Sequence, residues 1–213
     1  RASVLAVAIL VAAGAANTDA FHDVTSEWKV SFLQEHSPTS NKYLLETMGA
    51  GVALLDVNND GRLDVFFTNG AHIADPMAKG QMPDKSDEKY WNRFFEQAPD
   101  GTFKDTTSRA GLSGATQGRY NNGVATGDFD NDGFTDLYVT GYGGATLYRN
   151  RGDGTFEDVT ARAGVNAPGW STSAGFFDYD HDGKLDLLVC RYVEWTFAAN
   201  KYCGEKKPGG RSY

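Results

Sequence analysis

One sequence element occurs three times in this chain, and it constrains the fold more than any other feature. The copies lie at residues 51–67, 123–139 and 174–189, and each passes from small and apolar residues through an Asp-rich stretch into a second apolar segment. A second element at 101–112 recurs at 154–165 and interleaves with the first. Self-similarity every ~50 to 70 residues is typical of repeat architectures.

Each unit predicts four antiparallel strands. In the first unit the expected strands lie at 49–55, 65–68 and 93–96, and the third strand of the second unit is expected at 146–149. The expected turns to a fourth strand are Asp100-Gly101 and Asp153-Gly154. Asp-Gly between alternating segments is a strong hairpin signal. Four strands per repeat predict an all-β protein built of β-propeller blades. The small residues of the first strand suit close packing near a propeller axis.

The repeats are expected at about 49–112, 122–165 and 173–213, within a propeller region over 21–213. Because closed propellers need ~4 to 8 blades, we expect a partial ring of about three. The segment 21–25 resembles the second element and is expected to form the outer strand of a last blade. Residues 72–91 are polar and contain Pro76 and Pro83, which predicts a surface loop.

The first 20 residues have the pattern of a secretory signal peptide. Arg1 precedes 15 uncharged residues, which fall short of the ~20 that span a bilayer. We therefore expect a secreted protein, extracellular or periplasmic, with no membrane span in the mature chain. Cys190 and Cys203 allow a small-loop disulfide, or a bridge to a partner beyond the chain end.

The Asp-rich stretches follow the pattern D-x-[DN]-x-D-G-x-x-D, and we call them loop one (56–64), loop two (128–136) and loop three (178–186). Ca²⁺ needs six to eight oxygen ligands at ~2.3 to 2.6 Å, which alternate loop side chains supply. Glycine at position six permits a sharp turn, and position seven offers its backbone carbonyl. The predicted ligands are Asp56, Asn58, Asp60, Arg62 and Asp64; Asp128, Asp130, Asp132, Phe134 and Asp136; Asp178, Asp180, Asp182, Lys184 and Asp186.

Other interpretations of the loops are weaker. An EF-hand needs glutamate at position twelve, where this chain has Phe67, Val139 and Val189. Mg²⁺ fits less well because it keeps several waters in a rigid octahedron. Metal-free Asp-Gly turns remain an alternative, but clustered carboxylates repel one another unless a cation offsets them. The composition supports a dedicated role for the aspartates, since 20 of the 28 acidic residues are Asp and only 8 are Glu, which favours helices.

The stretches 49–70, 122–140, 148–160 and 173–190 resemble FG-GAP/VCBS repeats, which also occur in integrin α-subunits. They are most similar to secreted proteins of the cartilage acidic protein (ASPIC/UnbV) type. This resemblance implies a calcium-stabilised, seven-bladed propeller with the loop aspartates as ligands. Asn58 departs from the pattern and lowers the charge of loop one.

The leading functional hypothesis is a non-enzymatic, exported, calcium-binding scaffold whose outer loops bind a protein or glycan, as in adhesion or matrix modules. The alternative is the propeller of a secreted polysaccharide-acting enzyme or oxidoreductase with its catalytic residues in other blades. The net charge of −8 argues against nucleic-acid binding. The tripeptide Arg151-Gly152-Asp153 is expected to be a hairpin turn, because it aligns with Ala98-Pro99-Asp100 of the preceding repeat.

Overall fold

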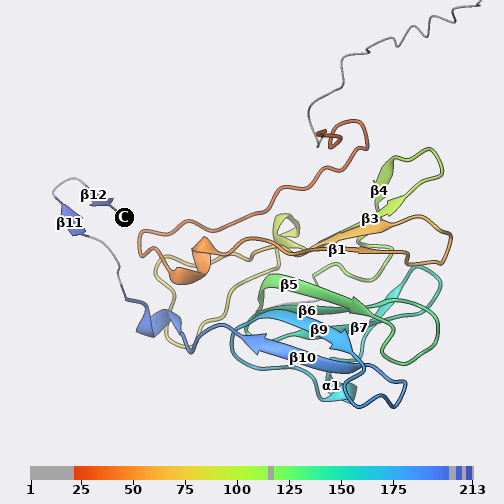
Figure 1. The fold of residues 1–213 in the computed structure, drawn as a ribbon. Coiled ribbons are helices and arrows are strands. Elements are labelled where there is room, and N and C mark those ends of the chain that lie inside the picture. The colour runs from red at the N-terminus through yellow and green to blue at the C-terminus, as the bar shows by residue number, and fades with distance from the viewer. Residues whose placement is uncertain (1–21, 115–117, 202–204, 208–209, 213) are drawn as a thin grey trace, which may run out of the picture.

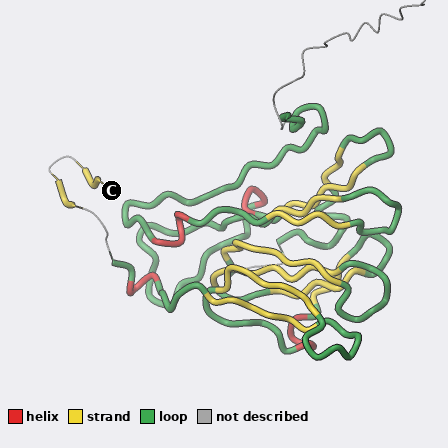
Figure 2. The backbone as a smooth tube through the Cα atoms, in the orientation of Figure 1, coloured by secondary structure: helices red, strands yellow, loops and turns green. Residues whose placement is uncertain are grey.

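The computed structural model describes residues 22–114, 118–201, 205–207 and 210–212, which form antiparallel β-sheets with very little helix (Figures 1 and 2). The first sheet has the order β1 (Val52–Leu55), β2 (Asp64–Phe67), β3 (Arg93–Gln97), β4 (Phe103–Asp105). The second has the order β5 (Tyr120–Gly127), β6 (Asp136–Tyr142), β7 (Thr146–Asn150), β8 (Phe156–Asp158). The prediction of an all-β chain with four-stranded antiparallel repeats is confirmed.

Two smaller sheets and four short helices complete the secondary structure of the described residues. Strand β9 (Ser171–Phe177) pairs with β10 (Asp186–Arg191), and β11 (Glu205–Lys207) pairs with β12 (Gly210–Ser212). The helices are η1 (Leu44–Thr47), η2 (Glu88–Tyr90), α1 (Thr160–Ala163) and η3 (Phe197–Ala199). Among the described residues, no helix combines the length and apolarity needed to cross a membrane.

The three Asp-rich loops close their hairpins in the same register. The residue before position one pairs with position nine in each case: Leu55 with Asp64, Gly127 with Asp136, and Phe177 with Asp186. The predicted Asp-Gly turns join β3 to β4 and β7 to β8. Each is tightened by a threonine that donates its backbone nitrogen and hydroxyl to the turn aspartate, as Thr155 does to Asp153.

The main core lies between the first two sheets. Phe66 and Phe94 from the first sheet pack with Leu137 and Tyr148 from the second, and all four side chains are buried. A second cluster joins the other face of the second sheet, through Tyr138, to β9 and β10. Burial of apolar area contributes ~25 cal/mol per Å², so these faces supply the main force that holds the sheets together.

The first strands of the repeats lie close together, as the small residues predict. A Cβ built on Gly51 would lie 2.9 Å from the carbonyl oxygen of Asn122, and one on Gly123 only 2.1 Å from that of Thr172. A larger side chain at either position would therefore force the strands apart. This close approach brings the following loops near one another.

The segment 72–91 is not the simple surface loop that its polarity predicted. His72 and Asp84 form an antiparallel bridge, and the Lys85 side chain is completely buried. The Lys85 ammonium donates to the carbonyl of Asn69 and to the side-chain oxygens of Asn92 and Asn121, at 2.7 to 3.0 Å. Most other residues of the segment are exposed, as expected for a surface loop, and these three acceptors offset the cost of burying the Lys85 charge.

The described part of the predicted strand at 21–25 also differs. Residues 22–24 are irregular and a turn begins at Thr25, because the local hydrogen bonds are satisfied within the segment. Thr25 donates its backbone nitrogen to Asp23 at 2.9 Å, and Trp28 donates to the carbonyl of Val24 at 2.8 Å. The signal-peptide prediction for residues 1–20 and the pairing of Cys203 fall outside the described residues.

Candidate metal centre

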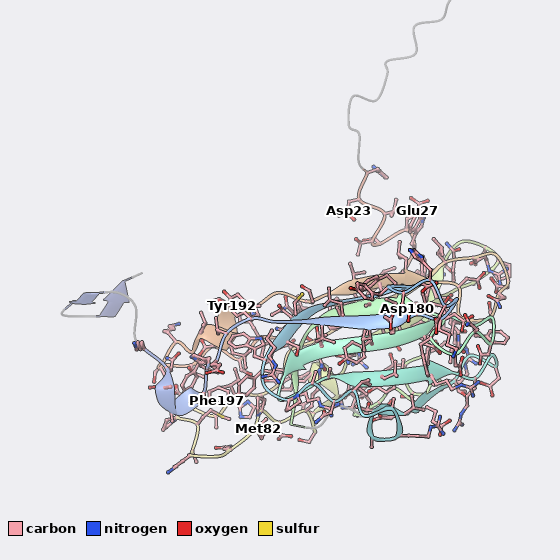
Figure 3. All side chains as sticks on the ribbon, turned by 60° about the horizontal axis from the view of Figure 1, so that its bottom comes forward. Asp23, Glu27, Met82, Asp180, Tyr192 and Phe197 are labelled. Carbon is pink, nitrogen blue, oxygen red and sulfur yellow. The ribbon has the colours of Figure 1, made fainter. Side chains whose placement is uncertain are left out.

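The three Asp-rich loops lie at the same end of the sheets (Figure 1). Each follows the first strand of its repeat, namely β1, β5 or β9. Figure 3 shows Asp180 of loop three at one end of the strands, whereas Tyr192 and Phe197 lie at the opposite end. The three loops therefore lie together at one end of the strands, apart from Tyr192 and Phe197 at the other end (Figures 1 and 3).

The carboxylate at position one organises each loop from within. Asp56 accepts hydrogen bonds from the backbone nitrogens of Asp60 and Gly61, at 3.0 and 2.7 Å. Asp128 and Asp178 make the same two bonds, at 2.8 to 3.1 Å. Positions four and six adopt positive φ, with values of 56° at Asn59 and 83° at Gly61. Glycine adopts this left-handed region freely, which explains its place at position six, and position four holds Asn59, Asn131 or His181, residue types that are enriched there.

Three carboxylates converge in loops two and three. One oxygen each from Asp128, Asp130 and Asp136 lie within 4.8 Å of one another. Asp178, Asp180 and Asp186 form the equivalent group. These residues occupy positions one, three and nine. In loop one, position three is Asn58, so two carboxylates and one amide oxygen occupy the same positions.

Positions five and seven contact each other instead of joining the carboxylate groups. Asp132 accepts a hydrogen bond from the backbone nitrogen of Phe134 at 3.0 Å, and Asp182 accepts one from Lys184 at 2.8 Å. In loop one, Asp60 accepts from the backbone nitrogen of Arg62 at 3.0 Å and also contacts the Arg62 guanidinium. In all three loops position seven thus contacts position five through its amide nitrogen, whereas its predicted role concerns its carbonyl.

In loops one and two, position nine joins the loop to the third strand. Asp64 accepts from the backbone nitrogens of Val57 and Gln97, each at 2.9 Å. Asp136 accepts from Phe129 and Asn150, at 3.0 and 2.7 Å. Asp186 accepts from Tyr179 at 2.9 Å. This structural role had no signal in the ligand pattern, which treats position nine only as an oxygen donor.

Burial makes the charge at position nine costly in loops one and two. It raises the pKa of the Asp136 carboxyl to about 6, against the opposing effect of its two backbone hydrogen bonds, and the nearby Asp130 and Asp132 charges raise it further. Burial also raises the pKa of Asp64. A cation beside such a group favours its ionised form.

Arg149 on β7 contacts loop two, and the sequence pattern did not identify it as part of the site. Its Nε lies 2.5 Å from one carboxylate oxygen of Asp130, and its Nη2 lies 2.5 Å from one carboxylate oxygen of Asp132. The equivalent residue of the first sheet is Glu96, so the repeats differ in charge at this position. This reversal of charge was the signal that the sequence offered. The contact itself was missed because the Arg149 side chain reaches the loop only once β7 is placed beside β6.

The donor set fits a hard divalent cation. It consists of oxygen atoms, and the convergent carboxylates repel one another without a counter-charge. Loop two has Arg149 as a partial counter-charge. In loop three, across the described residues, no Lys or Arg nitrogen lies within 4.0 Å of Asp178, Asp180 or Asp186. Lys184 reaches only Asp182, at 4.0 Å.

Comparison with known proteins gives one family and three related sequences. The FG-GAP-like repeat profile matches residues 56–139 and 128–189. Cartilage acidic protein 1 of Homo sapiens is 32% identical over 152 residues, which are 70% of this chain and 21% of that protein. The proteins of the same name from Mus musculus and Xenopus tropicalis are 30% and 25% identical over 152 and 151 residues. The chain thus matches about a fifth of the length of these relatives.

Proposed function

This chain belongs to the FG-GAP-like repeat family, and we propose that it is an exported, non-enzymatic scaffold whose three Asp-rich loops bind Ca²⁺ for structural stability. The observation that carries this proposal is the convergence of carboxylates from positions one, three and nine in loops two and three, within 4.8 Å. Loop one supplies the same positions with one amide in place of a carboxylate.

The ligand chemistry favours calcium over magnesium. Asp128, Asp130 and Asp136 would hold the ion in loop two, and Asp178, Asp180 and Asp186 in loop three. Ca²⁺ accepts irregular sets of six to eight oxygens, so carbonyls and waters can complete the set. The bound ion would offset the carboxylate charge and hold the two ends of each loop together. Since position nine also bonds to the third strand, the ion would stabilise the whole sheet edge.

A scaffold role follows from how the repeats use their residues. The facing sides of the first two sheets are packed in the core, whereas the connecting segments expose side chains such as Tyr192 at the end opposite the Asp-rich loops (Figure 3). A protein or glycan partner would bind these connecting segments, away from the ions. Export is supported by the pattern of residues 1–20 and would place the loops where free calcium is abundant.

Thermal unfolding in excess calcium, excess magnesium and chelator tests the proposal. With free calcium ~100- to 1,000-fold above Kd, binding adds about 2 to 4 kcal/mol to the free energy of unfolding. We expect a clear rise in Tm with calcium and a smaller one with magnesium. A Tm that chelator leaves unchanged, together with no bound metal by elemental analysis, would overturn it.

A further inference from the structure

Side-chain hydrogen bonds connect each Asp-rich loop to the next. The Asn59 side-chain amide in loop one donates to the carbonyl oxygen of Gly133 in loop two at 2.9 Å. The Asn131 amide in loop two donates to the carbonyl oxygen of Gly183 in loop three at 3.0 Å. Donor and acceptor occupy the same positions in both cases, namely position four and position six of the following loop.

The backbone at position four directs these side chains out of their own loops. Asn59 and Asn131 have φ of 56° and 57°, in the left-handed region. Each sits between positions three and five, and Asp130 at position three points into the carboxylate group of loop two. Any interaction that fixes positions three and five therefore also fixes the side-chain amide at position four between them.

The receiving peptide group carries a second hydrogen bond. The Gly183 carbonyl and the Lys184 amide belong to one planar peptide unit. That amide donates to Asp182 at 2.8 Å, so a single rigid plane joins Asn131 of loop two to the position-five carboxylate of loop three. The Gly133–Phe134 peptide joins Asn59 to Asp132 in the same way.

From this geometry we propose that Asn59 and Asn131 are positioning residues that couple ion binding between neighbouring loops. The inference rests on the proposed calcium function. An ion that orders loop two fixes Asn131, which in turn holds the peptide next to position seven of loop three in place. By linkage, an ion in loop three strengthens binding in loop two by the same factor. One exposed hydrogen bond corresponds to a two- to tenfold change in affinity, at about 1.4 kcal/mol per tenfold.

Glycine substitutions test the coupling without straining the backbone, because glycine adopts positive φ freely. Asn131→Gly removes the link from loop two to loop three. Lys29→Gly is the matched control, since Lys29 also has positive φ, at 59°, is exposed, and lies outside the Asp-rich loops. Asn59→Gly provides the second case, from loop one to loop two.

Terbium serves as the calcium probe, and Tyr179 at position two of loop three sensitises its luminescence. We expect Asn131→Gly to weaken terbium binding in loop three two- to tenfold, with Lys29→Gly unchanged from wild type. A purely structural link would lower Tm without moving the terbium affinity. Equal affinities for Asn131→Gly and Lys29→Gly would overturn the coupling while leaving calcium binding intact.

Hydrogen exchange in the metal-free chain gives a readout independent of the ion. Exchange across residues 178–186 should be faster in Asn131→Gly than in Lys29→Gly. A wild-type chain that binds neither terbium nor calcium overturns the proposed function and the affinity coupling together. Faster exchange in that chain would still show the link between the loops, and unchanged exchange would remove the link as well.

Discussion

Asp136 accepts a 2.7 Å hydrogen bond from the backbone nitrogen of Asn150, which ties loop two to the third strand of its sheet. Its other carboxylate oxygen accepts from Phe129 at 3.0 Å. Asp64 makes the equivalent pair of bonds in the first sheet. Position nine therefore stabilises the sheet before any ion binds through bonds to the backbone, whereas Asp130 at position three reaches the third strand only through the Arg149 side chain.

Replacing Asp136 with Asn should destabilise the chain even in chelator. Asparagine keeps the shape but can accept with only one oxygen, which leaves a backbone donor unsatisfied at a cost of about 1 to 3 kcal/mol. Asp130→Asn is the control, and we expect it to change the free energy of unfolding in chelator by less than about 1 kcal/mol. Urea unfolding of both variants in chelator measures the difference; equal stabilities would contradict a structural role for position nine.

The stabilisation by calcium should depend on pH through Asp136. Its pKa is about 6 in the fold and about 3.9 in an unfolded chain, so its contribution to metal-free stability is fully present below pH ~4. That contribution is lost as pH rises through 6, where the ionised form becomes a better calcium ligand. The increase in Tm on adding calcium should therefore grow from pH 5 to pH 7. A constant increase over this range would be inconsistent with Asp136 as a ligand.

Replacing Arg149 with Gln should tighten calcium binding in loop two. The guanidinium contacts Asp130 and Asp132, and its side chain is only 32% exposed, so it competes with a cation for the same carboxylates. We expect a two- to fivefold gain in affinity and a lower Tm in chelator. Arg162→Gln makes the same charge change away from the loops and should leave the calcium isotherm unchanged. Titration calorimetry that finds equal affinities for the two variants would contradict the competition.

Lys85→Met should destabilise the fold without changing calcium affinity. Burial holds the pKa of Lys85 well below its usual range, and methionine would leave the carbonyl of Asn69 and the side-chain oxygens of Asn92 and Asn121 without this donor. We expect a loss of about 2 to 4 kcal/mol by urea unfolding. Lys79→Met, at an exposed position of the same segment, should cost less than about 0.5 kcal/mol. Similar losses for the two variants would show that the Lys85 contacts contribute little.

The strands and hairpins could be predicted because their signals are local. Asp-Gly turns, alternating apolar residues and the repeat itself place β2, β3 and β7 within one residue of their observed bounds. The loop positions follow from the same short-range pattern, since Asp128 bonds to residues only four and five positions away.

The contacts that the sequence did not reveal are those between distant segments. Arg149 reaches loop two only because β7 pairs with β6, and Asn59 meets Gly133 across 74 positions of sequence. Lys85 lies in a polar segment, and its burial depends on acceptors from several parts of the chain. No local pattern encodes these distances, so the loop links and the buried ammonium emerge only from the assembled sheets.

Calcium stoichiometry after equilibrium dialysis, measured by elemental analysis, tests the metal sites most directly. We predict three Ca²⁺ per wild-type chain, one for each Asp-rich loop, and two for the Asp128→Ala variant, which removes position one of loop two. A wild-type chain that holds no calcium, or an Asp128→Ala chain that holds as much as wild type, would contradict the assignment of these loops as calcium sites.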